Sequence, residues 1–564
     1  MIRVNQVKLP VSHSEADLRK KTAKMMGVST DQIQSMELVR QSLDARKKPD
    51  LYYLYALDVA VAGKEAAIVK RARSVNVQIR KEEAYRLPDP GIEPLRERPV
   101  IVGFGPAGMF CGLMLARAGY RPLILERGLD ADSRAKAVAR YWTDGTLDPE
   151  CNVQFGEGGA GTFSDGKLNT LVKDPSGRNK EVLKILAQAG ADPTITYVNK
   201  PHVGTDVLRT VVKNIRSEIE SLGGEVRFGC RLEDFETQNG HLCSIRVSAR
   251  KGTSEAGRTV EEIPASALVL AIGHSARDTF AMLAEKPLDM QAKAFAVGLR
   301  IQHPQTQINL SQYGREEAGN LGAASYKLTA QTSGGRGVYS FCMCPGGFVV
   351  DASSEPGRLA INGMSNHDRA GANANSALIV TVTPEDFPQP GTLGGVTFQR
   401  QLEEAAYRCG GGKIPTAQKA AQAEQSQRDE HDQHRGLDRG AGKARQRNQS
   451  PPERRAAHGH PRVDRQHGKQ HGPRIGVRVE HIGRQGDPED GDRRGKSPCP
   501  AAWGDALGAA HREVCRQVQK HRVQIGQHHK RHREPQLDGH PHGDGLQDGQ
   551  GRVVGAQAEI VRIG

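Results

Sequence analysis

The sequence predicts an α/β protein: a doubly wound, Rossmann-like domain with an inserted β-rich domain, a small N-terminal α+β domain and a disordered C-terminal tail. Three observations lead to this prediction. A glycine-rich turn joins an apolar strand to a helix near residue 103. Short β-like and helix-like runs alternate over the first 88 residues. All 12 Phe, 11 Tyr and 10 Met lie at or before Tyr407, so the end of the 564-residue chain has a different composition.

A small α+β domain is predicted over residues 1–88. Its β-like runs and helix-like segments follow an order that resembles a βαββαβ layer. The β-like runs are 2–7, 51–61 and 75–79, and the helical segments are 15–26 and 64–71. Pro88, Pro90 and Pro94 come next, among charged residues. Because proline interrupts both helices and inner strands, this stretch is predicted to be a linker.

A dinucleotide-binding domain is predicted over residues 98–285. Residues 100–102 form an apolar strand of the kind that is buried on both faces of a parallel sheet. A G-x-G-x-x-G turn follows, and a helix then opens at Pro106 and Ala107, where a first turn accepts proline. The three glycines of the turn are Gly103, Gly105 and Gly108. Such glycines let the backbone approach a pyrophosphate, while the helix start offers free N–H groups.

An acidic residue completes this pattern. A second apolar strand at 122–125 ends in Glu126, which lies 18 residues after Gly108. A carboxylate at the end of this strand accepts hydrogen bonds from a ribose in dinucleotide-binding folds. The strand, turn, helix, second strand and acid together favour dinucleotide binding over a merely tight turn between a strand and a helix.

A second glycine run, 156–161, has the same spacing in a different context. No sufficiently long apolar strand precedes it, and TFSDGK follows it in place of a helical pattern. We therefore expect a loop that passes close to a flat or anionic group, and not a second nucleotide-binding fold. A flexible surface loop is the alternative interpretation.

Further elements are expected in the rest of this domain. Thr205 and Asp206 begin a helix over 207–221, and two glycines end it. An apolar strand at 267–272 ends at Gly273. Ser275 and Asp278 match a helix capping box.

A β-rich substrate domain is predicted over residues 286–410, with strands at 295–301, 337–344 and 348–351. Cys342 and Cys344 project to one face of the second strand, and a buried apolar strand would produce that spacing without any redox role. We therefore favour a structural role for both cysteines. His202 and His274 are at least as consistent with turn residues as with catalysis.

Several longer motifs carry a family resemblance over residues 1–415. They are GFGPAG with Glu126, NVQFGEGGAGTFSDGKLNT, KPHVGTDVLR, LAIGHSARDTF, FAVGLRIQHP, FCMCPGG and NGMSNHDRAGANANSA. Together they resemble the bacterial NAD(P)/FAD-dependent oxidoreductases usually described as uncharacterised FAD-dependent dehydrogenases.

The resemblance implies noncovalently bound FAD and a set of residues around it. The cofactor-binding candidates are Gly103, Gly105, Pro106, Ala107, Gly108, Glu126, Arg127, Gly158, Gly159, Ala160, Gly161, Thr162 and Gly273. The glycine turn and Glu126 would hold the pyrophosphate and ribose, 158–162 would border the flavin, and Gly273 would lie near the cofactor. The catalytic residues remain unknown, with His274, Arg277 and His367 as candidates only.

The resemblance stops near Thr416. Family members continue with more helix and a Gly-rich segment that closes over the flavin, and neither can be found here. Residues 417–564 are a low-complexity basic tail with a net charge of +8 out of +14. A frameshift in the gene or its sequence is our leading hypothesis, and a genuine basic tail is the alternative. Since the tail has few apolar side chains, either origin predicts disorder.

No metal site is expected. His458, His460, His528, His529 and His532 could act as ligands only if a fold held them in place. The nine cysteines show no repeated C-x-x-C, which is consistent with a reducing cytoplasm. There is neither a signal-peptide core nor an apolar run long enough to span a membrane.

The function we expect is that of an FAD-dependent dehydrogenase, which moves hydride to or from an unidentified small molecule, with NAD(P)H as a possible donor. One alternative is an inactive or truncated flavoprotein, because the closing segment is missing. Another is a flavin-dependent enzyme of RNA modification, although the net charge of +6 in residues 1–416 makes nucleic acid an unlikely partner. The oligomeric state cannot be derived from the sequence.

Overall fold

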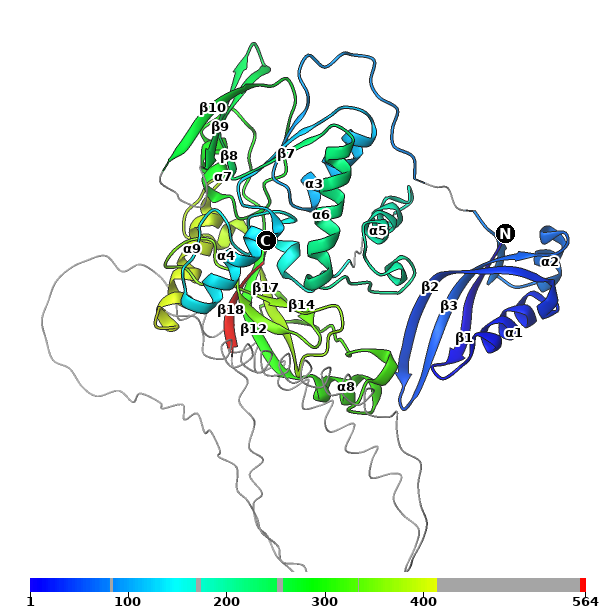
Figure 1. The fold of residues 1–564 in the computed structure, drawn as a ribbon. Coiled ribbons are helices and arrows are strands. Elements are labelled where there is room, and N and C mark those ends of the chain that lie inside the picture. Colours follow the sequence, from blue (N-terminus) through cyan, green and yellow to red (C-terminus); the bar gives the residue numbers. More distant parts are fainter. Residues whose placement is uncertain (82–84, 169–173, 251–256, 333, 413–557, 564) are drawn as a thin grey trace, which may run out of the picture. The chain divides into compact units, whose positions relative to one another are not determined.

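The computed structural model describes residues 1–81, 85–168, 174–250, 257–332 and 334–412, together with the backbone of 558–563 (Figure 1). These residues fall in one unit, formed by Met1–Ala423 and Ala509–Gly564, whereas Glu424–Gly508 lies outside the described residues. Most of the predicted tail, including its five candidate metal-binding histidines, also lies outside them. Within the described part of the chain, no helix has the length and apolar character needed to cross a membrane.

The N-terminal residues form an antiparallel four-stranded sheet with two helices, in the predicted order βαββαβ. The elements are β1 (Ile2–Pro10), α1 (Glu15–Met26), β2 (Ile33–Lys47), β3 (Asp50–Val61), α2 (Glu65–Ala72) and β4 (Val77–Ile79). The sheet order is β2-β3-β1-β4, and its core includes Ile2, Leu57 and Met26. The strand β2 was not among the predicted β-like runs, because most of its side chains are polar and at least partly exposed.

A parallel sheet forms the centre of the next part of the chain. It comprises β5 (Val100–Val102), β6 (Leu123–Glu126), β7 (Glu225–Phe228) and β11 (Leu268–Leu270), in the order β11-β5-β6-β7. Alternate residues of its central strands point to opposite faces. Ile101 and Ile124 join one buried cluster, while Val102 and Leu125 join another.

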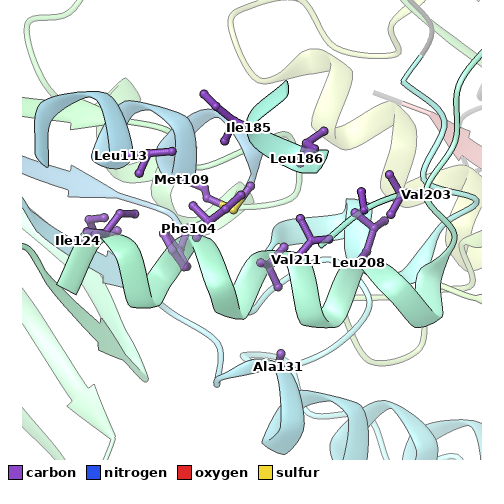
Figure 2. Close-up of a cluster of buried hydrophobic side chains, with 14 of the residues drawn as sticks. Phe104, Met109, Leu113, Ile124, Ala131, Ile185, Leu186, Val203, Leu208 and Val211 are labelled. Atoms are coloured by element: carbon purple, nitrogen blue, oxygen red, sulfur yellow. The ribbon is translucent and has the colours of Figure 1, made fainter. Parts of the chain in front are cut away.

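Helices cover the first face of this sheet (Figure 2). They are α3 (Pro106–Arg117), α5 (Arg178–Gln188) and α6 (Thr205–Ser221), of which α6 begins at the predicted Thr205. Leu208, Val211, Ile215 and Ile219 of α6 recur at helical spacing and are buried against the sheet and α3.

An antiparallel sheet covers the second face. It consists of β8 (Cys230–Gln238), β9 (His241–Arg250) and β10 (Arg258–Pro264). Leu232, Ile245 and Val247 from this sheet are buried against Val102 and Leu125. The parallel sheet therefore lies between helices on one side and strands on the other.

A seven-stranded sheet includes the β-rich region expected over 286–410. Its strands are β12 (Phe295–Pro304), β13 (Thr329–Gln331), β14 (Gly337–Cys344), β15 (Phe348–Asp351), β16 (Ile361–Met364), β17 (Asn373–Val382) and β18 (Ala558–Ile563). The sheet order is β13-β14-β17-β12-β18-β16-β15. The strand β18 lies in the segment predicted to be a tail, and the structure pairs it with β12 and β16.

The remaining helices lie along the chain between the strands of these sheets. They are α4 (Ala131–Asp144), α7 (Arg277–Ala284), α8 (Gln305–Tyr313), α9 (Gly394–Cys409) and the short 3-10 helices η1 (Thr30–Gln32), η2 (Gly159–Phe163), η3 (Pro193–Thr196), η4 (Gly319–Leu321) and η5 (Pro384–Asp386). The capping box predicted at Ser275 is wrong, because Ala276 caps α7 without a side-chain hydrogen bond. The Ser275 hydroxyl donates instead to Oε1 of Gln154, at 3.2 Å.

Candidate functional site

Two glycines of the first turn allow close packing of the backbone. Gly103 has a φ of +100°, and a Cβ there would lie 2.4 Å from the carbonyl oxygen of Ala271, beside β11. A Cβ at Gly108 would lie 1.9 Å from the carbonyl oxygen of Gly103. Both contacts are far shorter than real Cβ atoms show, so a side chain at Gly103 would push the turn away from Ala271 and one at Gly108 would push α3 away from the turn.

Gly105 has a different environment. It caps α3 with a φ of −75°, which any residue adopts, and a Cβ there would meet only the Cα of Gly159, at 3.7 Å. Pro106 and Ala107 beside it are exposed. The N–H groups of Ala107 and Gly108 lie in the first turn of α3. N–H groups in the first turn of a helix have no carbonyl acceptor within the helix. This end of α3 thus offers donors and open space to an anion.

The second glycine run lies against this helix start. Gly158 caps η2, and a Cβ at Gly159 would lie 2.9 Å from the Cα of Gly105. A Cβ at Gly161 would lie 3.9 Å from Cγ of Pro106. Residues 158–162, with half-exposed Ala160 and buried Thr162, therefore face the first turn. Because the two backbones approach so closely, this run is not a freely exposed surface loop.

Arg134 of α4 holds the second run in shape, a role that no pattern in the sequence predicts. Its guanidinium is fully buried and donates to four backbone carbonyls. The acceptors are Asn152 at 2.9 Å, Val153 at 3.0 Å, Glu157 at 2.7 Å and Gly159 at 2.9 Å. Burial lowers the pKa of Arg134 to about 10, which leaves it charged at neutral pH. A buried cation thus orders the loop that borders the candidate site.

Glu126 is buried at the end of β6 and joins three loops. Its carboxylate accepts backbone N–H groups of Phe104 at 2.7 Å, Gly128 at 2.9 Å and Gly156 at 2.9 Å. A carboxylate has about four acceptor positions, and these bonds occupy three of them. Glu126 therefore shapes the candidate site by holding the three loops together.

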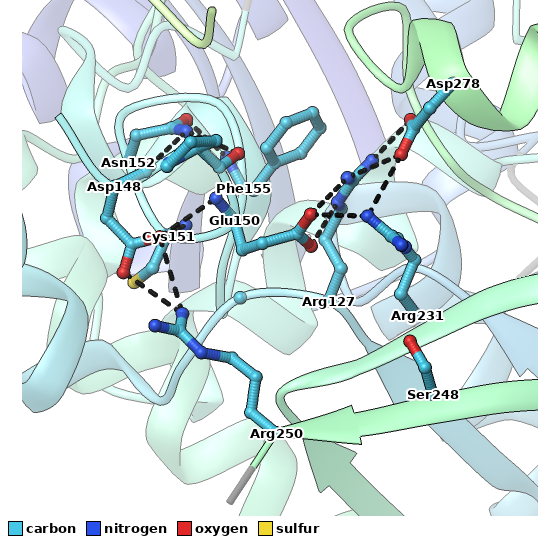
Figure 3. Close-up of polar contacts among 12 residues, drawn as sticks. Arg127, Asp148, Glu150, Cys151, Asn152, Phe155, Arg231, Ser248, Arg250 and Asp278 are labelled. Carbon is cyan, nitrogen blue, oxygen red and sulfur yellow. Dashed lines mark hydrogen bonds and ion pairs between the residues drawn. The ribbon is translucent and has the colours of Figure 1, made fainter. Parts of the chain in front are cut away.

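Arg127, the other candidate at the end of β6, is part of a charged network (Figure 3). Its guanidinium contacts Glu150 at 3.0 and 3.1 Å and Asp278 at 2.8 and 2.9 Å. It also lies 4.2 Å above the ring of Phe155. Arg231 reaches the same Glu150 at 2.8 Å. These contacts join β6, β8 and α7, so the structure gives Arg127 a positioning role beside the turn.

Gly273 and His274 follow β11 at the same end of the parallel sheet. Gly273 is exposed with a φ of +67°, and a Cβ there would meet no atom within 4 Å. The exposed His274 has its Nδ1 2.9 Å from the hydroxyl oxygen of Ser275. Both residues lie just beyond Ala271, whose carbonyl adjoins Gly103.

The other two catalytic candidates make structural contacts. Arg277 is buried and bonds Glu403 of α9 at 2.7 and 3.0 Å. Nδ1 of His367 lies 3.0 Å from the carbonyl oxygen of Val203, and its own carbonyl oxygen lies 2.8 Å from Nε2 of His202. The two histidine rings stack at 5.5 Å. These contacts join the start of α6 to the segment after β16.

The arrangement fits a dinucleotide. Gly105 shows this fit, because a Cβ there would enter the open space at the start of α3 without a short contact to any other atom of the chain. Ala107, Gly108 and the 158–162 run border that space. Among the described side chains, no group of three or more His, Cys, Asp or Glu is placed to hold a metal ion.

Two family descriptions and one relative match parts of this chain. A family described as "FAD-dependent protein, C-terminal domain-like" matches residues 294–446, a span that crosses Thr416, and a domain of unknown function matches residues 1–60. A protein of Clostridium beijerinckii, described only as uncharacterized, is 48% identical over 413 residues, which are 73% of this chain and 75% of the relative.

Solved structures are similar at much lower identity. Glycerol-3-phosphate dehydrogenase of Bacillus halodurans, solved with FAD, is 12% identical, with 51% of this chain and 47% of that protein covered and a TM-score of 0.26. An anhydrotetracycline hydroxylase of Streptomyces rimosus is 16% identical, with coverages of 51% and 47% and a TM-score of 0.25. The chain thus spans about half the length of these two proteins.

The family assignment rests on the close relative and on the FAD-dependent domain match. Nearly half of the aligned residues are identical over three-quarters of the relative's length. The chain therefore belongs to the same family as the Clostridium beijerinckii protein, and its residues 294–446 match the FAD-dependent C-terminal domain that the motifs led us to expect.

Proposed function

We propose that the chain is an FAD-dependent dehydrogenase that transfers hydride between the flavin and a small-molecule substrate. The observation that carries the proposal is the meeting of two glycine runs at the start of α3, where Gly105 and Gly159 leave backbone donors facing open space. FAD would supply two-electron chemistry there. A reduced nicotinamide dinucleotide is the proposed electron donor.

The chain's own groups would bind and orient the cofactor. The first-turn amides of Ala107 and Gly108 would donate to the pyrophosphate. The free acceptor position of Glu126 would accept from a ribose hydroxyl. The run 158–162, held by Arg134, would border the flavin ring. We also propose a cytoplasmic location, because the described cysteines are free thiols, as expected in a reducing compartment.

The test begins with the cofactor of the purified full-length chain. Flavin released on denaturation should be FAD and should approach one per chain. Anaerobic addition of NADH or NADPH should then bleach the flavin absorbance, and small-molecule electron acceptors should restore it. A variant of the open position, Gly105→Leu, should carry little FAD, while Gly337→Ala on β14 should carry as much as wild type, since a Cβ there meets nothing.

The outcomes separate the alternatives. A folded chain without flavin would contradict the proposal and support the inactive flavoprotein. FAD that no nicotinamide dinucleotide reduces would exclude the proposed donor while leaving the cofactor assignment intact. Salt-sensitive retention of RNA by the yellow protein would instead favour an enzyme of RNA modification.

A further inference from the structure

A second cluster of reactive groups lies where the segment after η2 meets β14. Lys167 extends its ammonium to 3.5 Å from Sγ of Cys344. It also lies 3.4 Å from Asp165, which Arg369 engages through Nε at 3.0 Å and through a second nitrogen. Cys344 is buried and Cys342 is partly exposed. The segment that follows the 158–162 run, which borders the candidate flavin site, therefore contacts a pair of thiols.

The backbone at these thiols departs from a regular strand. The pairing of β14 with β17 shifts register between Phe341 and Cys344, and Cys342 has a φ of +45°. Residues i and i+2 of a regular strand are roughly 6.6 Å apart, near the upper end of the Cα separations that a disulfide spans. The register shift makes this stretch depart from that regular geometry. A non-glycine residue with a positive φ is strained, and such residues often lie at functional sites. The structural role expected for the two cysteines stays a prediction beside the redox role argued below.

Positive charge surrounds the pair. Arg300 is 1% exposed and donates to the carbonyl oxygen of Cys342 at 3.2 Å. Its other bonds reach the neutral side-chain amides of Asn362 and Asn375. Among the side chains that the structure describes, Asp165 is the one carboxylate bonded to this group of Lys167, Arg300 and Arg369. A buried cation excess favours an anion nearby, and a thiolate supplies one.

The ionisation of the groups follows from these contacts. Hydrogen bonding from Cys344 holds the pKa of the Cys342 thiol well below its usual range against the effect of burial, and Lys167 and Arg300 act in the same direction. The same hydrogen bond, together with burial, raises the pKa of Cys344. Burial acts to lower the pKa of Lys167, but the two thiol groups and Asp165 raise it overall.

We propose that Cys342 and Cys344 form a dithiol redox site that reduces a small-molecule disulfide. The Cys342 thiolate attacks one sulfur of the substrate, the substrate S–S bond breaks and a thiolate leaves. Cys344 then attacks Sγ of Cys342, a Cys342–Cys344 disulfide forms and the second substrate thiol is released. Two electrons pass from the protein thiols to the substrate, and the proton of Cys344 ends on a released thiol. A dithiol reductant reverses the change.

The first experiment uses unmodified full-length protein and needs no flavin activity. Limiting iodoacetamide at pH 7 should alkylate Cys342 roughly ten-fold faster than the exposed Cys243, because an ordinary thiol is only a few per cent ionised at this pH. Oxidised glutathione should convert the pair into a disulfide and release two glutathione thiols per chain. Peptide mass spectrometry locates both products.

Variants test each role. Cys344→Ser should trap glutathione on Cys342 as a stable mixed disulfide, whereas Cys243→Ser should leave the reaction unchanged. Lys167→Gln should slow alkylation of Cys342 several-fold at pH 7, and Lys167→Arg should restore it. The inference fails if Cys342 in the wild-type chain reacts no faster than Cys243, or if glutathione stays on Cys342 while Cys344 is intact. These two measurements on the wild-type chain test the inference even if a variant does not fold.

Discussion

At the scale of single residues, Gly105 and Gly108 serve different purposes although one motif contains both. Gly105→Ala should lower the free energy of unfolding by at most about 1 kcal/mol, because alanine is a poorer N-cap than glycine. It should also lower the flavin content, because the added methyl group enters the space of the ligand. Gly108→Ala should destabilise the fold by about 1–3 kcal/mol because of the contact with Gly103. Urea unfolding and released flavin measure the two effects. Equal flavin content in Gly105→Ala and wild type would contradict the assignment.

Glu126 makes a second prediction at this scale. Glu126→Gln keeps one acceptor oxygen but places an NH₂ group where backbone N–H groups now donate. We expect a loss of about 1–3 kcal/mol in unfolding free energy, measured in urea on the protein freed of flavin, and a lower affinity for added FAD. Weakened FAD binding at unchanged stability would show that the three backbone contacts contribute little.

Because of His303 in β12, we expect the stability of the fold to depend on pH. Burial lowers its pKa to about 4 from an ordinary 6.5. Because the folded-state pKa is depressed, its contribution to stability is present above pH 6.5 and is lost as the pH falls from 6.5 through about 4. His303→Phe should therefore lose less stability than wild type between pH 7 and 4 in urea titrations. The exposed His241→Asn is the control, and identical slopes in all three proteins would refute the prediction.

At the scale of elements, Arg277 joins α7 to α9 through the buried Glu403. Arg277→Met should destabilise the protein by about 3–5 kcal/mol, because it removes a buried guanidinium that bonds Glu403, Glu355 and Gln399. The double variant Arg277→Met, Glu403→Leu should recover much of the loss. Arg358→Met, which breaks the more exposed pair with Glu404, should change stability by less than about 1 kcal/mol. A folded Arg277→Met protein with near-normal stability but no activity would restore Arg277 as a catalytic candidate.

At the scale of the whole molecule, β18 joins a sheet whose other strands lie between residues 295 and 382. The strand β18 pairs with β12 at six register positions and separates it from β16. Deleting residues 558–564 would leave the edge of β12 unpaired, so we expect a lower melting temperature and more aggregation than for the full chain. An unchanged melting temperature would show that the strand adds nothing, as expected if the tail arose from a frameshift.

Local patterns were enough to predict much of the framework. The order βαββαβ, the strand–turn–helix around Gly105, the position of Glu126 and the start of α6 are encoded in short-range spacing and in residues with strong backbone preferences. The strand β2 was not predicted because its mostly exposed, polar side chains do not alternate with apolar ones. The predicted capping box at Ser275 was wrong because the Ser275 hydroxyl donates to Gln154, which lies 121 residues away in the sequence.

What the sequence determined by itself is the kind of site: a glycine turn at a helix start, followed by an acid, suited to a dinucleotide. Only the tertiary structure decided which groups complete it. Arg134 meets the second glycine run, and Lys167 meets Cys344, across 177 residues. Side-chain contacts between distant segments leave no periodic signal in the chain, because they depend on how the sheets and helices pack and not on local spacing.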